Sequence, residues 1–76
     1  RIVIGSFVEI DDNGELENYF ILPEGGGLNI EEGGREIYVL TPEAPLADHL
    51  FNRRVGDIVE VRTPRGIRKL KIVSIQ

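Results

Sequence analysis

The sequence contains no cysteine, no methionine and no tryptophan, and it has a single histidine, His49. Without cysteine the chain can form neither a disulfide nor a thiolate metal site, and a zinc site would have to rely on carboxylates. No apolar run approaches the ~20 residues that a membrane-spanning helix needs, and no signal peptide is visible. We therefore expect no metal, no cofactor and no membrane contact. The lack of cysteine suits a cytoplasmic location.

The chain is short, because 76 residues suffice for one small domain (1–76) with a modest hydrophobic core. Its first residue is Arg1 rather than methionine. We therefore expect a domain excised from a longer chain, whose N-terminal region holds part of the parent protein's function.

Charge is unevenly distributed along the sequence. Residues 1–34 contain one basic and eight acidic residues, whereas residues 35–76 contain eight basic and five acidic ones. The overall net charge of −4 argues against non-specific binding to duplex nucleic acid, which needs several cations to neutralise phosphates. The basic half could favour an acidic protein patch, although ordinary surface charge gives the same pattern.

A hairpin is expected near the start of the chain. Residues 2–10 are rich in β-branched and aromatic residues and predict a strand, which Gly5 interrupts as a bulge would. Alternation places four side chains on one face of this strand: Ile2, Ile4, Val8 and Ile10. Asn13-Gly14 is a strong hairpin signal, so residues 16–22 form the return strand, which Pro23 ends.

The rest of the pattern predicts a loop, a helix and three more strands. Residues 23–34 contain five glycines and are expected to form a loop, which Leu28 and Ile30 anchor to the core. Strands are expected at 35–40, 57–62 and 67–75, with a turn at 63–66. This order predicts an α+β fold, with an antiparallel β-sheet wrapping one short α-helix.

That helix is expected over residues 45–51. Pro45 suits the first helical position, and Asn52 can adopt the left-handed conformation that ends a helix. One stripe of the helix is apolar and comprises Leu46, Ala47, Leu50 and Phe51.

Several candidate sites have a plainer structural explanation. The acidic residues at 11–15 lack the ligand spacing of an EF-hand loop and suit a solvated hairpin tip. The triple glycine at 25–27 lacks the lysine and the helix start of a phosphate loop. His49 follows Asp48 directly, and adjacent helix residues point in different directions, so the two form no dyad.

The basic residues of the second half could form a nucleic-acid face. They are Arg53, Arg54, Arg62, Arg65, Arg68, Lys69 and Lys71. Stacking aromatic residues are not interleaved with them, so a protein-docking or solvated face is preferred.

The segment between the expected strand and helix is the strongest candidate for recognition. Thr41-Pro42-Glu43-Ala44-Pro45-Leu46 holds two prolines, and each restricts the residue before it to extended conformations. Such a corner is stiff and loses little entropy on binding. The alternative stays open that the prolines merely end a strand and start a helix.

Three segments together resemble the C-terminal domain of the bacterial GreA/GreB transcript-cleavage factors. They are IVIGSFVEIDD (2–12), YFILPEGGG (19–27) and APLADHLFNRRVGDIVEVRTPRG (44–66). The third is similar to the family signature Ser-Pro-Leu followed by Val-Gly-Asp and Pro-x-Gly. Here these positions are Pro45, Leu46, 55–57 and 64–66, and the resemblance covers nearly the whole chain.

The resemblance implies an FKBP-like fold and a partner, bacterial RNA polymerase. Family members bind at the rim of the secondary channel, on a coiled-coil element of the β′ subunit. The corner implied to make this contact is Ala44-Pro45-Leu46, with Thr41 and Pro42. The family's cleavage chemistry resides in an N-terminal coiled coil, so this domain is expected not to be an enzyme.

Two departures and two alternatives accompany this expectation. Ala44 replaces the family's serine, and Asn52-Arg53 replaces its Gly-Lys. A peptidyl-prolyl isomerase is an alternative because FKBP-like folds host that activity. A regulator that binds another protein, such as nucleoside diphosphate kinase, is the other.

Overall fold

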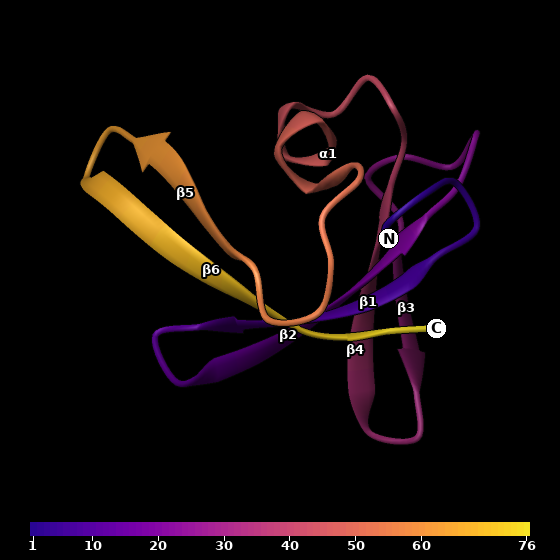
Figure 1. The fold of residues 1–76 in the computed structure, drawn as a ribbon. Coiled ribbons are helices and arrows are strands. Elements are labelled where there is room, and N and C mark those ends of the chain that lie inside the picture. Colours follow the sequence, from indigo (N-terminus) through magenta and orange to yellow (C-terminus); the bar gives the residue numbers. More distant parts are fainter.

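The computed structural model describes all residues from 1 to 76 and contains six strands and one helix. In chain order the elements are β1 (Phe7–Asp12), β2 (Glu15–Ile21), β3 (Asn29–Glu32), β4 (Arg35–Leu40), α1 (Pro45–Leu50), β5 (Ile58–Thr63) and β6 (Gly66–Ile75). The strands form one sheet in the order β3-β4-β2-β1-β6-β5. The curved sheet lies against α1, which sits over one of its faces (Figure 1). This arrangement confirms the α+β class.

The sheet is mixed, so the prediction of a purely antiparallel sheet is wrong. β2 and β4 pair in parallel, from Asn18 opposite Ile37 to Ile21 opposite Leu40. Every other neighbouring pair is antiparallel. A parallel pair needs a connection long enough to return the chain, and residues 22–34 provide it.

The first strand begins later than its composition predicts. Gly5 adopts φ +96°, and the Ser6 amide donates to the Val3 carbonyl at 3.0 Å, which makes residues 3–6 a turn. The Ser6 Oγ accepts from the Val3 amide at 3.0 Å and closes the same turn. Because the turn breaks the alternation, Ile2 is buried, whereas the side chain of Ile4 is 51% exposed.

The expected loop at 23–34 contains a strand. β3 forms an antiparallel hairpin with β4 through Gly33 and Gly34, which both have positive φ. Leu28 and Ile30 were expected to anchor this segment, yet they are 58% and 42% exposed. Ile30 lies on β3, the edge strand of the sheet, and Leu28 comes directly before that strand.

The helix agrees with its prediction to within one residue. Pro45 occupies the first turn after the N-cap Ala44, and Asn52 adopts φ +68° just past the C-cap Phe51. Of the predicted apolar stripe, Ala47 and Leu50 are fully buried. The other two stripe residues, Leu46 and Phe51, are partly buried and pack against the core.

The hydrophobic core lies between α1 and the sheet, and Tyr38 and Leu40 of β4 pack against its central cluster. It contains Ile2, Val8, Ile10, Tyr19, Ile21, Leu50, Val59, Leu70 and Ile72. Burying such side chains is the main favourable term in folding, at roughly 1.5–3 kcal/mol each. The only helix is six residues long, far too short to cross a membrane.

Candidate functional site: the corner before the helix

The corner comprises residues 41–46 and joins the end of β4 to α1. The Ala44 amide donates to the Thr41 carbonyl at 3.0 Å, which closes a four-residue turn. Pro42 stands at the second position of this turn, where its fixed φ is favoured. Pro45 then starts the helix, so both prolines hold the backbone in the conformation that it needs locally.

The five predicted docking residues all lie in this corner, three in the turn and two, Pro45 and Leu46, in the first turn of α1. Pro45 is exposed, while Thr41, Pro42, Ala44 and Leu46 are half-buried. Leu46 also packs against the hydrophobic core, so it serves the fold as well as the surface. The corner therefore offers a stiff, partly apolar surface that Leu46 anchors to the hydrophobic core.

The glycine-rich segment supports the corner from behind, which sequence reasoning missed. A Cβ added at Gly26 would lie 3.1 Å from both Cγ2 and Oγ1 of Thr41, so a larger residue would have to push that side chain aside by a few tenths of an ångström. The Leu22 amide also donates to the Leu40 carbonyl at 2.9 Å. The triple glycine could have signalled this close approach, because glycine is the residue that permits it.

Ala44 occupies the N-cap position of α1, but its side chain does not cap the helix. Its φ of −66° and ψ of 133° are the extended values that an N-cap adopts, but no side-chain hydrogen bond is made there. A serine, as in the family signature, would place a hydroxyl oxygen at this point.

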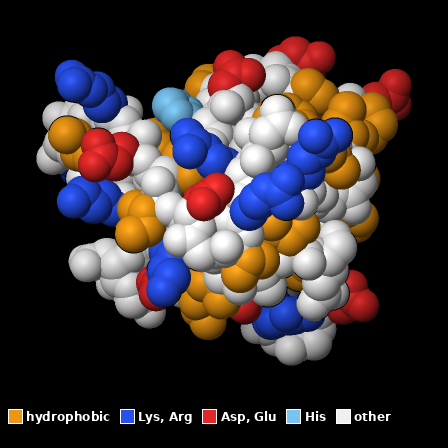
Figure 2. All heavy atoms as spheres, viewed as in Figure 1, with side chains coloured by type: hydrophobic (Ala, Val, Ile, Leu, Met, Phe, Trp, Pro, Cys, Tyr) orange, Lys and Arg blue, Asp and Glu red, His pale blue; other side chains and the backbone are white.

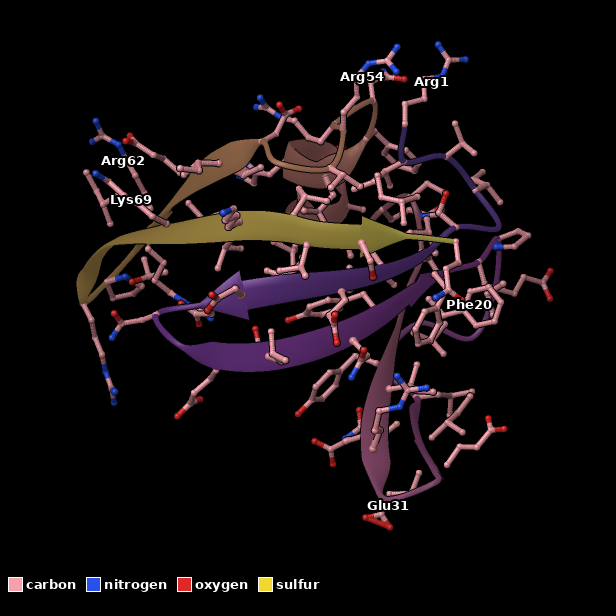
Figure 3. The ribbon with its side chains drawn as sticks, turned by 60° about the horizontal axis from the view of Figure 1, so that its bottom comes forward. Arg1, Phe20, Glu31, Arg54, Arg62 and Lys69 are labelled. Atoms are coloured by element: carbon pink, nitrogen blue, oxygen red, sulfur yellow. The ribbon has the colours of Figure 1, made fainter.

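The basic residues do not form one face. Figure 2 shows the Lys and Arg side chains in several separate groups. Arg62 and Lys69 lie together on the β5–β6 hairpin, whereas Arg54 and Arg1 lie apart from them at the top of the view in Figure 3, where the Ile2 amide donates to the Arg53 carbonyl. Arg53 Nε donates to the His49 carbonyl at 3.1 Å and so serves the end of the helix. The dispersion gives a nucleic-acid face no support.

The remaining sequence candidates have structural roles or none. Asp11 Oδ1 accepts a hydrogen bond from the Gly14 amide at 2.7 Å, which stabilises the hairpin tip. No group of three or more His, Asp or Glu side chains is placed to hold a metal ion. His49 is exposed on α1, and Gly25 and Gly27 have positive φ in a segment that no helix follows directly.

Comparison with known proteins identifies the family. The model of the GreA/GreB transcription elongation factor C-terminal domain matches residues 1–76. This chain belongs to the GreA/GreB family. It is 32% identical over 73 residues to the transcription elongation factor GreA of Thermomicrobium roseum, covering 96% of this chain and 43% of that protein. GreA of Geobacillus kaustophilus is 37% identical over 71 residues, covering 93% of this chain and 40% of that protein.

Solved structures give the same family. Gfh1 of Thermus aquaticus superposes with a TM-score of 0.75 at 26% identity, covering 99% of this chain and 47% of that one. GreA factor homolog 1 of Thermus thermophilus gives a TM-score of 0.70 at 27% identity over the same shares. This GreA/GreB C-terminal domain thus spans about half the length of its relatives.

Proposed function

We propose that this GreA/GreB domain docks onto bacterial RNA polymerase through the corner at 41–46. The docking point is the rim of the secondary channel, on a coiled-coil element of the β′ subunit. Family membership supports the partner, because the matching relatives are transcription elongation factors. In this proposal the domain contributes affinity and orientation and has no catalytic residues of its own. The proposal also includes that the domain has an FKBP-like fold.

The exposed proline at the start of α1, whose inner face is anchored in the core by Ala47 and Leu50, is the observation that carries the location. Pro45 presents its ring to solvent, and the backbone on either side is held by the Thr41–Ala44 and Ala44–Ala47 hydrogen bonds, at 3.0 and 2.9 Å. A preorganised surface of this kind loses little freedom on association. Binding energy at such interfaces is concentrated in a few residues, so single substitutions report on it.

The test is a fluorescence anisotropy titration of the labelled chain with RNA polymerase core enzyme. Pro45→Ala should weaken binding about five- to thirtyfold, the loss of one well-packed contact of about 1–2 kcal/mol. The matched control is Pro64→Ala, which removes the exposed proline of the β5–β6 turn. Asp12→Asn controls for a change of charge, and neither control should alter the affinity more than about twofold.

Equal affinities of the Pro45 and Pro64 variants would overturn the assignment of the corner. No binding by the unsubstituted chain would turn attention to another protein partner, sought by pull-down from bacterial lysate. The isomerase alternative gains no support from the clefts of the molecule, because Tyr38 is the only aromatic residue lining any of them. A short proline-containing peptide would assay that activity directly.

A further inference from the structure

The tip of the β1–β2 hairpin contains a chemically labile pair of residues, Asn13 and Gly14. Both residues are exposed, and their φ values are +55° and +90°. A Cβ added at Gly14 would meet nothing within 4 Å, so open space surrounds this residue. The side-chain amide of Asn13 is therefore followed along the chain by a backbone nitrogen whose own residue has no side chain to shield it.

An asparagine followed by glycine occurs only once in the chain. The other three asparagines precede residues with large side chains: Asn18 precedes a tyrosine, Asn29 an isoleucine and Asn52 an arginine. A large side chain in that position hinders approach to the backbone nitrogen that follows the asparagine. Asn52 also has a left-handed backbone, with φ +68°. It therefore shares the backbone conformation of Asn13 but lacks the following glycine, which makes it an internal control.

The chemistry open to this pair is ring closure between the side chain and the backbone. The Gly14 nitrogen loses its proton to hydroxide or a buffer base and attacks Cγ of Asn13. A bond forms between these two atoms, the bond from Cγ to Nδ2 breaks, and Nδ2 takes up a proton and leaves as ammonia. Water then opens the resulting succinimide at one of its two carbonyl carbons. Opening at Cγ gives aspartate, whereas opening at the backbone carbonyl carbon gives isoaspartate, in which the chain runs through the side-chain carbons.

Asp11 holds the proton that this reaction must remove. Its Oδ1 accepts a hydrogen bond from the Gly14 amide at 2.7 Å, a length typical of charge-assisted bonds. A carboxylate at this distance also disfavours the negative charge that loss of the proton leaves on the nitrogen. Strand pairing adds a second restraint, because Asp12 lies opposite Glu15 and fixes the two turn residues between them. The closed hairpin therefore resists ring closure, and the reaction requires the tip to open.

We propose that Asn13-Gly14 is a site of spontaneous deamidation, and that Asp11 sets its rate by holding the Gly14 amide. The only co-reactant is water, and the products are ammonia and a chain with aspartate or isoaspartate at position 13. Exposed turns open at a much lower free-energy cost than that of global unfolding. The reaction therefore proceeds in the folded chain, through local opening of this turn.

Deamidation changes both the charge and the backbone of the hairpin tip. It adds a negative charge beside three carboxylates that are already there, those of Asp11, Asp12 and Glu15. Isoaspartate also adds one carbon to the backbone of a two-residue turn, and the turn sets the register of the two strands. The tip lies away from α1 and the corner in Figure 1, so this site is separate from the proposed polymerase contact.

The test is a timed incubation of the folded chain at neutral pH, followed by digestion with an endoproteinase that cleaves after glutamate. Asn13 then lies in the peptide 10–15 and Asn52 in the peptide 44–60, and neither peptide contains another asparagine or glutamine. Mass spectrometry measures the replacement of the side-chain amide by a carboxyl group, and chromatography separates isoaspartyl from aspartyl peptides. We expect Asn13 to deamidate with isoaspartate among the products, and Asn52 to stay intact.

Matched variants separate the hydrogen bond from the general acidity of the tip. Asp11→Ala should raise the rate at Asn13 at least about fivefold in buffer, because the bond from the Gly14 amide to a charged acceptor is lost. Glu15→Ala removes a carboxylate beside the same turn without removing that bond, and it should change the rate less than about twofold. In urea, Asp11→Ala and the unsubstituted chain should react at the same rate, since neither forms the hairpin there.

Three results would overturn the proposal: an intact Asn13 after long incubation of the folded chain, equal rates at Asn13 and Asn52, or equal rates in Asp11→Ala and Glu15→Ala. Urea midpoints of both variants, measured in parallel, show whether each is folded in buffer. If Asp11→Ala does not fold, the unsubstituted chain decides the matter. Deamidation of Asn13 at least about fivefold faster in urea than in buffer supports protection by the closed hairpin, and equal rates overturn it.

Discussion

At the residue scale, Ala44 leaves α1 without a side-chain acceptor at its N-cap. The first amides of a helix have no partner within the helix, and an N-cap side chain normally accepts a hydrogen bond from one of them. At this cap the backbone already has the right extended conformation, but alanine offers no acceptor. The short helix α1 therefore begins with a deficit that a single substitution can remove.

We predict that Ala44→Ser stabilises the chain by about 1 kcal/mol, within the 0.5–2 kcal/mol range of cap substitutions. The urea midpoint should rise while the slope of the transition stays constant, because the same surface is exposed on unfolding. Glu43→Ser is the matched control, since it places the same hydroxyl one residue before the cap. A midpoint that rises equally in both variants would argue against capping as the cause.

Single residues were predictable from the sequence where their backbone role is local. Pro45 at the start of the helix and Asn52 in the left-handed conformation after it both depend only on neighbouring residues, and both are confirmed. The predicted inward orientation of Ile4 was wrong, because the prediction continued the strand alternation across Gly5, where the chain forms a turn. The five predicted docking residues lie within six consecutive positions, 41–46, so proximity in sequence was sufficient to bring them together.

At the scale of elements, two hairpins use the same kind of turn. The β1–β2 turn consists of Asn13 and Gly14, and the β3–β4 turn consists of Gly33 and Gly34, all with positive φ. Two-residue hairpin loops favour such conformations because their twist matches that of the strands. The Asn-Gly signal was read correctly, whereas the Gly-Gly signal was hidden because three other glycines precede it in the same segment.

Substitution at Gly33 should therefore separate conformational cost from steric cost. A Cβ at this position meets nothing within 4 Å, so only the backbone φ of +59° resists a side chain. We predict that Gly33→Val destabilises the chain by about 1–2 kcal/mol, whereas Gly33→Asn changes stability by less than about 0.5 kcal/mol. Urea unfolding measures the difference, and faster amide exchange in β3 should accompany the valine variant. Equal behaviour of the two variants would contradict a left-handed turn.

At the scale of the whole molecule, the parallel pairing of β2 with β4 could not be predicted from local sequence patterns. Local patterns identify strands but not their neighbours in the sheet, and here residues 22–34 separate the two partners. The point at which β2 and β4 begin to pair was invisible for the same reason, because it depends on two strands that lie far apart in the sequence.

The two tyrosines make the stability of the whole molecule sensitive to alkaline pH. Burial, reinforced by the Glu17 carboxylate, raises the pKa of Tyr19 well above its ordinary value of 10.0. The hydrogen bond to Glu36 raises the pKa of Tyr38. The folded state therefore holds these protons more tightly than the unfolded chain does. Their contribution to the free energy of unfolding is fully present below about pH 10 and is lost as the pH rises toward the folded-state values.

We predict that tyrosinate absorbance of the folded chain develops at higher pH than that of the chain in urea. Tyr19→Phe should remove the later step and flatten the alkaline decline of the unfolding free energy, because the buried hydroxyl no longer resists ionisation. Tyr38→Phe is the matched control, since it removes the more exposed hydroxyl and leaves the late step in place. The chain has only two tyrosines and no tryptophan, so each step can be assigned by absorbance alone. Coincident titration curves in the folded and urea-unfolded states would show that the environment of Tyr19 does not favour its neutral form.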